Sequence, residues 1–567
     1  AGGGKLTLKN GTVRSAGADA DGGVLYLEGP ESQLNLEDVT LTNTDDTAIA
    51  DKRYGGVIYA CGFGDTPAVI NVKGNTTING SASAKRLCGG AVALVGNCQM
   101  FMQSGTIQGG KAGNGGNIYA DEASRLYITG GTVTGGETPN VSTTTGDGGN
   151  IYLTGQAQVH FFDGTITAGT AKLNGGNVFV ACTGKDEDKG FYQYSGLIEN
   201  GVADNAGGNI YAMEKSTLLR IYGGSIKTGT AKQGGNVYLL ASKLEMRGGT
   251  LQGHENTVIS SGGNIYALGG RIDLYDGRIA GGVTKGSGGN IFGENVTIQM
   301  YGGSIMAGAS EASGMATGGG NLFLQGKSSF DMYDGEIAYG MTNQSGLGGV
   351  STGPNVMIVG QTRMQMFGGS IHDATVQGVA SRGSCVLVNG QAKDSNAVFH
   401  MYGGTLEDPG AMGKDSWGHL AAAYSSSDSQ AGFGRVRIFD GELNYTGSKE
   451  AAVLRQTFHG SRGHADNGYN MFLFDTSLKN WTTAASYVGA CTDRSHNTKT
   501  GSVEATCVTP GYTQYHCNTC GDWCKITSQP TGHEVTTTEV AATEQLPAYN
   551  EHSCSKCGVW REIPAAE

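Results

Sequence analysis

A Gly-Gly-Asn triplet, followed by an aliphatic and usually an aromatic residue, recurs through this 567-residue chain. Its asparagines are Asn117, Asn150, Asn177, Asn209, Asn236, Asn264, Asn290 and Asn321, and degenerate copies precede and follow them. Successive spacings are roughly 26 to 35 residues, a period typical of a solenoid. The chain contains 98 glycines, which suits a fold that turns sharply once per period, because glycine enters positive φ without steric cost.

Each period also contains an alternating strand that ends in Gly-Gly or Asp-Gly, followed by a short third strand, as in Leu219 to Ile226. Copies of this pattern begin near Leu6 and end near Leu478. We therefore predict an all-β fold: a right-handed, three-sided parallel β-helix of about sixteen coils over residues 1–484. A small Cys-rich domain follows over 485–567, with two degenerate repeats at about 491–530 and 531–567.

The alternation assigns the faces of the strands, because successive side chains of a strand point to opposite sides. The aliphatic residue after each repeated asparagine and the residue two positions later should point into the core. The asparagines stand at the bend before the strand, where we expect each to hydrogen-bond to its copy in the next coil. We interpret them as a structural ladder.

The same parity places two rows of aromatic residues on the outside. One row contains Tyr119, Tyr152, Tyr211, Tyr238 and Tyr266, and a neighbouring sheet carries Tyr222, Tyr275, Tyr301, Tyr333 and Tyr402. Bare rings would form a larger apolar patch than a monomer normally exposes. Three interpretations are open: the rings stack on one another or lie under loops, they form a protein interface, or they form a platform for glycans.

Charge and hydropathy restrict the partners. The formal net charge is -12 with a pI near 5.4, and we find no run of Lys and Arg suited to a phosphate backbone, so we expect no nucleic acid. No apolar stretch is long enough to predict a membrane span. The chain begins with Ala1 rather than Met, which suggests processing. Residues from Lys5 onward already match a coil, which predicts an open strand edge that receives another copy of the chain, head to tail.

Seven of the twelve cysteines lie in the tail. Such density in a short segment suggests an oxidising compartment or a metal-stapled module. Two Cys-x-x-Cys pairs, Cys517 with Cys520 and Cys554 with Cys557, have the spacing of a four-thiolate zinc site, with His516, His533 or His552 as substitute ligands. Disulfides that include Cys507 and Cys524 explain the same cysteines. Zinc and disulfides both stay open, and we predict no other cofactor.

The coil pattern resembles the pectate-lyase-type parallel β-helix superfamily, in particular the Gly-rich repeat surface proteins of Gram-positive anaerobic bacteria. The tail is similar to the Ala-Thr-Cys, Pro-Gly-Tyr, Cys-x-x-Cys-Gly repeats of such secreted proteins. It departs from that motif at Glu544, where a cysteine is expected. The resemblance implies a secreted protein, extracellular or at the cell surface.

Many β-helices cleave polysaccharides with clustered carboxylates. Asn43-Thr44-Asp45-Asp46 resembles the start of such a cluster, but no matching Asp pair, His-Gly and Arg-x-Lys follow on the next coils. Isolated acids such as Asp276 stand where sister coils have glycine, so turn geometry explains them. We predict a non-enzymatic structural protein, the subunit of a self-assembling filament or a surface stalk. The alternatives are a polysaccharide lyase or glycoside hydrolase, and a glycan-binding adhesin.

Overall fold

The computed structural model describes residues 3–15, 20–44, 53–83, 85–139, 145–183, 189–254, 258–312, 317–342, 350–375, 380–390, 397–408, 420–424, 435–438, 441–445, 456–457, 471–475, 480–483, 498–516, 523–556 and 558–562. Across these ranges the chain consists of strands, turns and loops, and no helix occurs. Accordingly, none of the described segments is a helix with the length and apolar character needed to cross a membrane.

The first side of the molecule is a 15-stranded parallel sheet, to which successive coils each add one strand. Its strands are β2 (Leu25–Glu28), β5 (Ile58–Gly62), β9 (Val92–Gly96), β12 (Ile118–Ala120), β16 (Ile151–Gly155), β20 (Val178–Cys182), β24 (Ile210–Met213), β28 (Val237–Leu240), β31 (Ile265–Leu268), β34 (Ile291–Glu294), β38 (Leu322–Gln325), β43 (Val356–Val359), β47 (Val386–Gly390), β50 (Leu420–Tyr424) and β53 (Gln456–Thr457). We call it the first sheet. The triplet asparagines precede its strands, as predicted.

The other two sides belong to one 28-stranded sheet that bends between two rows of strands. The second row contains β1 (Lys5–Ser15), β3 (Gln33–Asn43), β6 (Ala68–Lys73), β10 (Cys98–Met102), β13 (Arg125–Ile128), β17 (Gln158–Phe161), β21 (Gly190–Gln193), β25 (Leu218–Ile221), β29 (Lys243–Gln252), β32 (Arg271–Ala280), β35 (Thr297–Met300), β39 (Ser329–Met332), β44 (Arg363–Met366), β48 (Val398–Met401), β51 (Arg435–Ile438) and β54 (Met471–Asp475). The long strands β1, β3, β29 and β32 continue around the bend, which joins the two rows.

The third row contains β7 (Thr77–Asn79), β11 (Thr106–Gln108), β14 (Thr132–Thr134), β18 (Thr165–Thr167), β22 (Leu197–Glu199), β26 (Ser225–Lys227), β36 (Ser304–Met306), β40 (Glu336–Ala338), β45 (Ser370–His372), β49 (Thr405–Asp408) and β52 (Glu442–Tyr445). Short pairings support the return to the first sheet: β4 (Arg53–Tyr54) with β8 (Arg86–Cys88), β15 (Glu137–Thr138) with β19 (Thr170–Ala171) and β23 (Val202–Ala203), β27 (Ala231–Gln233) with β30 (Val258–Ser261), β33 (Val283–Thr284) with β37 (Ala309–Ser310) and β41 (Met341–Thr342), and β42 (Val350–Thr352) with β46 (Ala380–Arg382).

The core runs inside the coils without interruption from Leu34 to Val436. Equivalent side chains stack in register, as when Ile118 pairs with Ile151 and Ile151 with Val178, all three fully buried. Each such side chain contributes roughly 1.5 to 3 kcal/mol on burial. The inward positions predicted from the alternation are therefore confirmed, and the fold is the predicted parallel β-solenoid.

The glycines of the triplet are required by the tight corner before the first sheet. Gly175 has a φ of +66°, and a Cβ on Gly176 would lie 2.2 Å from the carbonyl oxygen of Gly208 in the next coil. The first glycine therefore allows the bend, and the second allows neighbouring coils to approach closely.

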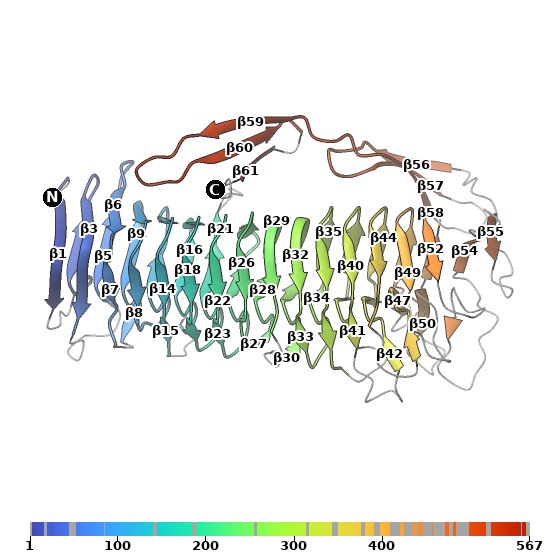
Figure 1. Cartoon of the computed structure of the whole chain (residues 1–567), viewed down its shortest axis with the longest axis horizontal. Coiled ribbons are helices and arrows are strands. Elements are labelled where there is room, and N and C mark those ends of the chain that lie inside the picture. The colour runs from blue at the N-terminus through green and yellow to red at the C-terminus, as the bar shows by residue number, and fades with distance from the viewer. Residues whose placement is uncertain are drawn as a thin grey trace.

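The number of coils differs somewhat from the predicted sixteen, since the first sheet contains fifteen strands. At the far end of the solenoid, β54 pairs antiparallel with β55 (Asn480–Thr483), which reverses the strand direction. The coils follow one another along the long axis of the molecule (Figure 1).

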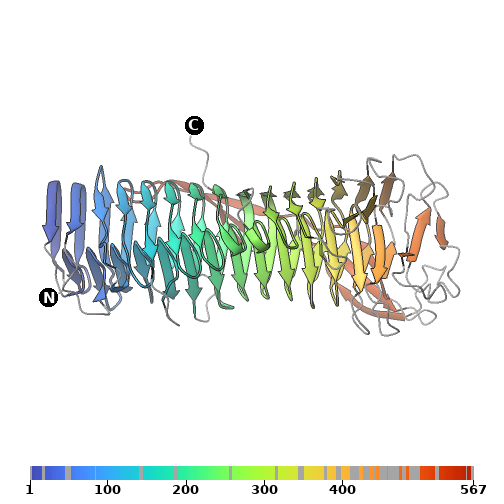
Figure 2. The same cartoon turned by 90° about the horizontal axis from the view of Figure 1, so that it is seen from below.

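The tail forms two small antiparallel sheets. The first contains β56 (Thr498–Val503), β57 (Gly511–His516) and β58 (Trp523–Ser528), and the second contains β59 (Val535–Val540), β60 (Tyr549–Cys554) and β61 (Gly558–Glu562). From the far end of the solenoid the tail turns back and runs beside the coils toward the first ones (Figures 1 and 2). The tail is therefore a strap along the solenoid.

Candidate functional site

The asparagine ladder is present and continuous. Each side-chain amide donates from Nδ2 to Oδ1 of its copy in the next coil, at 2.6 to 2.9 Å, from Asn117 through Asn321. The last of these bonds reaches Asn355, a further rung that the sequence analysis missed because Pro354 replaces the second glycine. All of the ladder amides are at most 1% exposed.

Asn236 shows how an internal rung uses the full hydrogen-bonding capacity of its amide. Asn236 donates to Asn264 at 2.6 Å and to the carbonyl oxygen of Gln252 at 2.9 Å. Its Oδ1 accepts from Asn209 at 2.8 Å and from the backbone N–H of Gly229 at 3.1 Å. A primary amide has two donors and two acceptor positions, so nothing of this group is left for a ligand. The ladder links the corner of each coil to the next coil.

The first aromatic row points away from the core, as predicted, but its rings are mostly buried. Tyr119, Tyr211, Tyr238 and Tyr266 are 7 to 9% exposed. From Tyr119 to Phe323 successive rings stack with centroids 4.6 to 5.7 Å apart and interplanar angles of 3 to 18°. Neighbouring rings therefore occupy one another's faces, which favours the stacking interpretation over an open platform.

The second aromatic row follows the ends of the second-row strands and also stacks. Tyr194 and Tyr222 lie 5.0 Å apart, and the run from Tyr275 through Tyr301, Tyr333 and Phe367 to Tyr402 has spacings of 4.6 to 5.2 Å. The row is interrupted in β29, where Arg247 follows Met246 at the position that Tyr222 occupies after Ile221 in β25. There the guanidinium of Arg247 lies 4.3 Å from the centroid of Tyr275 and continues the stack as a cation–π contact.

A row of mostly polar side chains lies beside the second aromatic row and was missed from the sequence. It occupies the position two residues before each of those rings, or before Arg247 in β29. It contains Arg220, Glu245, Asp273, Gln299, Asp331 and Gln365, which pair in register from coil to coil. In the earlier coils the same position holds Asn71, Phe101, Tyr127, His160 and Tyr192. We call this position, from Asn71 to Gln365, together with the second aromatic row, the docking face.

The acids in the middle of the docking face are neutralised by cations. Glu245, only 3% exposed, accepts from Arg247 at 2.5 Å and from Arg220 at 3.1 Å. Asp273 accepts from Arg271 at 2.7 Å, and Lys243 lies 3.4 Å from Glu245 and 3.3 Å from Asp273. Burial by itself would raise the pKa of Glu245, but the two arginines outweigh it and hold that pKa below its usual value. An acid that stays ionised is a poor proton donor at neutral pH.

The tail lies on the docking face at both of its ends. In the second small sheet, Glu544 pairs with Lys73 at 2.6 Å, and Gln545 donates to Asn71 at 3.1 Å. The side chain of Gln103 donates to the carbonyl oxygen of Glu544. Leu546 packs against an apolar cluster of Phe162, Tyr192, Tyr194 and Leu218. The residue that departs from the tail repeat is therefore a contact with the solenoid.

The first small sheet meets later coils through Lys525. Its ammonium group donates to Gln365 at 2.9 Å and lies 4.0 Å from the ring centroid of Tyr512 and 5.7 Å from that of Phe367. Burial, with Arg363 nearby, lowers the pKa of Lys525 to about 8. The contacts from Asn71 to Gln365 show that the strap covers much of the length of the docking face.

The tail also closes a polar hollow of about 280 Å³ over the first coils. Its lining includes Lys5, Lys9, Glu37, Lys73 and Glu544. The pairs Lys9 with Glu37 and Lys73 with Glu544 are each 2.6 Å apart. One of these ion pairs lies within the first coils, and the other links the tail to the solenoid.

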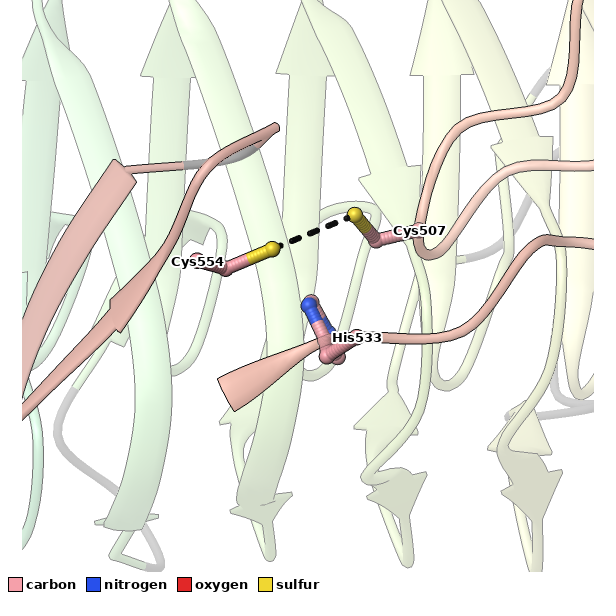
Figure 3. A group of neighbouring side chains, drawn as sticks. All are labelled: Cys507, His533 and Cys554. Carbon is pink, nitrogen blue, oxygen red and sulfur yellow. Dashed lines mark hydrogen bonds between the residues drawn. The ribbon is translucent and has the colours of Figure 1, made fainter. Parts of the chain in front are cut away.

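The structure brings together a set of metal-binding groups different from the predicted one. Cys507, His533 and Cys554 come from three segments of the tail, and their ligand atoms all lie within 4.8 Å of one another (Figure 3). Cys517, Cys520 and Cys557 of the predicted set lie outside the described residues, as do Asp45 and Asp46 of the predicted acidic motif. Of the four predicted thiolate ligands, only Cys554 is therefore placed. It lies beside Cys507 and His533, one of the predicted substitute ligands, rather than in a described four-thiolate site.

No family model, curated protein or solved structure matches the chain.

Proposed function

We propose that this chain is a rigid, non-enzymatic structural protein of a bacterial cell surface, serving as a stalk or as the subunit of a head-to-tail filament. The observation that carries the proposal is the unbroken asparagine ladder from Asn117 to Asn355, in which internal rungs such as Asn236 use all four hydrogen-bonding positions for their neighbours. Together with the stacked core and rings, it couples the coils from Asn117 to Asn355 to one another, and a solenoid coupled in this way resists bending.

The edge of the first coil supports the filament form of the proposal. Leu6, Leu8 and Val13 of β1 occupy the positions of Leu34, Leu36 and Leu41 in β3. The residues in β3 are at most 2% exposed, whereas Leu6 is 44% exposed. Within the described part of the chain, β1 pairs with β3. The proposal is that the coil of a second copy covers the backbone groups and apolar side chains on the other side of β1.

Placement outside the cell rests on the resemblance of the coil pattern to surface proteins, and the solenoid thiols do not contradict it. Burial raises the pKa of Cys98 and of Cys182 to about 12. Thiols of this kind carry almost no thiolate at neutral pH and react slowly. They are compatible with an oxidising compartment.

Electron microscopy of the purified chain tests the proposal. Fifteen strands spaced by about 4.8 Å should give straight rods about 70 Å long. As the concentration rises, the rods should join end to end into filaments. A variant with Leu6→Lys and Leu8→Lys should still form rods but no filaments, because charges would enter the contact. Val202→Lys, at a 39% exposed position on the side of the solenoid, is the matched control and should assemble normally.

The two parts of the proposal fail separately. Single rods over a wide range of concentration would refute head-to-tail assembly and leave the stalk. Particles that bend or collapse would refute the rigid solenoid itself.

A further inference from the structure

Three side chains suited to a soft metal ion meet where the two small sheets of the tail join. Cys507 lies in the turn between β56 and β57, His533 in the linker between β58 and β59, and Cys554 at the end of β60. Figure 3 shows the three side chains pointing toward one another from these segments. Both cysteines are buried, at 4% and 2% exposure, whereas His533 is exposed. The group is therefore dry on the sulfur side and open to solvent on the imidazole side.

The distance between the two sulfurs is longer than a disulfide bond and fits two ligands of one metal ion. The Sγ atoms of Cys507 and Cys554 lie 3.6 Å apart. A disulfide requires about 2.05 Å. Two thiolates on one tetrahedral zinc ion, each at about 2.3 Å, are separated by about 3.8 Å. The observed distance is close to that of two ligands that share an ion.

Local backbone structure holds the ligands in place. Thr506 caps the turn before Cys507, since its Oγ1 accepts from the N–H of Thr509 at 2.9 Å. The linker is tied to this turn, because Thr531 donates to the carbonyl oxygen of Thr506 at 2.8 Å and Gly532 donates to that of Cys507 at 3.2 Å. These bonds place His533, the next residue, beside the thiols.

We propose that Cys507, His533 and Cys554 bind a thiophilic divalent cation of the zinc class. Two thiolates and one imidazole are ligands that zinc prefers, and they leave a fourth position for water or another donor. Cys507 belongs to the first tail repeat, and His533 and Cys554 to the second. The ion therefore joins the two small sheets, each of which contacts a different part of the docking face. The site does not depend on assembly into filaments.

The repeat itself explains why the site joins two units. Thr543 caps its turn as Thr506 does, with its Oγ1 accepting from the N–H of Leu546 at 2.9 Å, so Glu544 occupies the position of Cys507. In the first repeat this position supplies a sulfur to the next repeat. In the second repeat it supplies a carboxylate to Lys73 of the solenoid. The same turn thus links a unit to its neighbour in both cases, through a metal in one and an ion pair in the other.

The test is metal binding by the full chain, purified with a reductant, stripped with a chelator and titrated with Co²⁺ and then Zn²⁺. Bound Co²⁺ should show a thiolate charge-transfer band and the strong visible bands of tetrahedral cobalt, and Zn²⁺ should displace it. Cys507→Ser should bind one equivalent fewer than the unchanged protein. His533→Ala should weaken zinc binding at this site by at least about tenfold, since one ligand is lost. Cys61→Ser, in a solenoid coil, is the control and should bind normally.

Two results would overturn the proposal. One is the same number and affinity of bound ions in Cys507→Ser as in the unchanged protein. The other is a Cys507–Cys554 disulfide in peptide maps of protein isolated without reductant. X-ray absorption of the zinc-loaded chain gives the sulfur and nitrogen ligands directly, and it decides the matter even if a cysteine variant fails to fold.

Discussion

The asparagine ladder makes its sharpest prediction at Asn236, which lies in the middle of the run. Asn236→Ala removes an amide that is 1% exposed and that holds four partners, three of them buried. Two of these partners are donors, the side chain of Asn209 and the backbone N–H of Gly229. An unsatisfied buried polar group costs about 1 to 3 kcal/mol. With the two acceptors added, we expect the coil to lose roughly 3 to 6 kcal/mol of stability.

Hydrogen exchange followed by mass spectrometry is the suitable assay, because a long solenoid need not unfold in one step. A loss of about 4 kcal/mol should lower the protection of amides near residues 229–240 by about a thousandfold. Protection in distant coils should change much less, because coils contact only their neighbours.

The matched control is Asn205→Ala. Asn205 is exposed and donates to Asn174 at 2.9 Å in an outer ladder of the neighbouring coils. The Asn205→Ala variant makes the same chemical change as Asn236→Ala but leaves no buried group unpaired. Its free energy of unfolding should therefore change by no more than about 0.5 kcal/mol. If Asn236→Ala proves as mild as Asn205→Ala, the buried amides do not hold the coils together and the rigid-rod argument loses its basis.

Three further predictions concern the rings, the outer ladder and the strap. Tyr238→Ala should cost about 3 kcal/mol in a denaturation assay and leave any binding on a glycan array unchanged, because the ring faces are covered by Tyr211 and Tyr266; a selective loss of glycan binding would contradict this. Burial raises the pKa of Asp147 to about 6, so the native state holds this proton more tightly than the unfolded chain, and stability falls as pH rises from about 4 through 6. Asp147→Asn should remove that loss and be more stable than the unchanged protein at pH 7.5, by about 1 kcal/mol, but not at pH 4; equal pH profiles would refute the pKa argument. Leu546→Glu should release the tail and make it sensitive to protease, whereas Val535→Glu, at a 46% exposed site of the same small sheet, should not; equal sensitivity would show that Leu546 does not hold the strap.

The solenoid could be predicted from the sequence because its determinants repeat. Period-two alternation assigned inward residues such as Ile151 and Ile221, which are at most 1% exposed. The Gly-Gly-Asn triplet predicted the ladder because one residue type at one register position must meet its own copy. Asn355 was missed because Pro354 breaks the sequence triplet. Its amide is nevertheless hydrogen-bonded in the ladder.

The docking face could not be found in the same way, because its residues share a position rather than a residue type. Arg220, Glu245 and Asp273 have no common motif, and only the alignment of strands shows that they adjoin. A comparison of the residues two places before each ring of the second aromatic row would have given the signal. The group of Cys507, His533 and Cys554 was harder still, because it depends on how one tail repeat lies against the next.

The register of the strap follows from the irregular positions of the docking face. A repetitive surface by itself would allow the tail to bind in several registers, each shifted by one coil. The contacts that are made use residues that change from coil to coil. A shift of the tail by one coil toward the first strand would move Glu544 from Lys73 to Glu37, the residue that pairs with Lys73 in the preceding coil. Two carboxylates would then meet. The same shift would exchange Gln365 for Asp331 at Lys525.

The two ends of the strap therefore respond differently to a shift. Near Lys73 the change is repulsive, whereas at Lys525 it brings an acid to a lysine and is attractive. The register then depends on the Glu544 end, where Gln545 and Leu546 also have their particular partners. Lys73→Glu tests this reasoning, because it should weaken the observed register of the tail and favour a tail shifted along the solenoid. Adding Glu544→Lys to the same chain should restore the observed register. A tail whose cross-links to the solenoid stay the same in all three proteins would show that the repeat, and not its exceptions, sets the register.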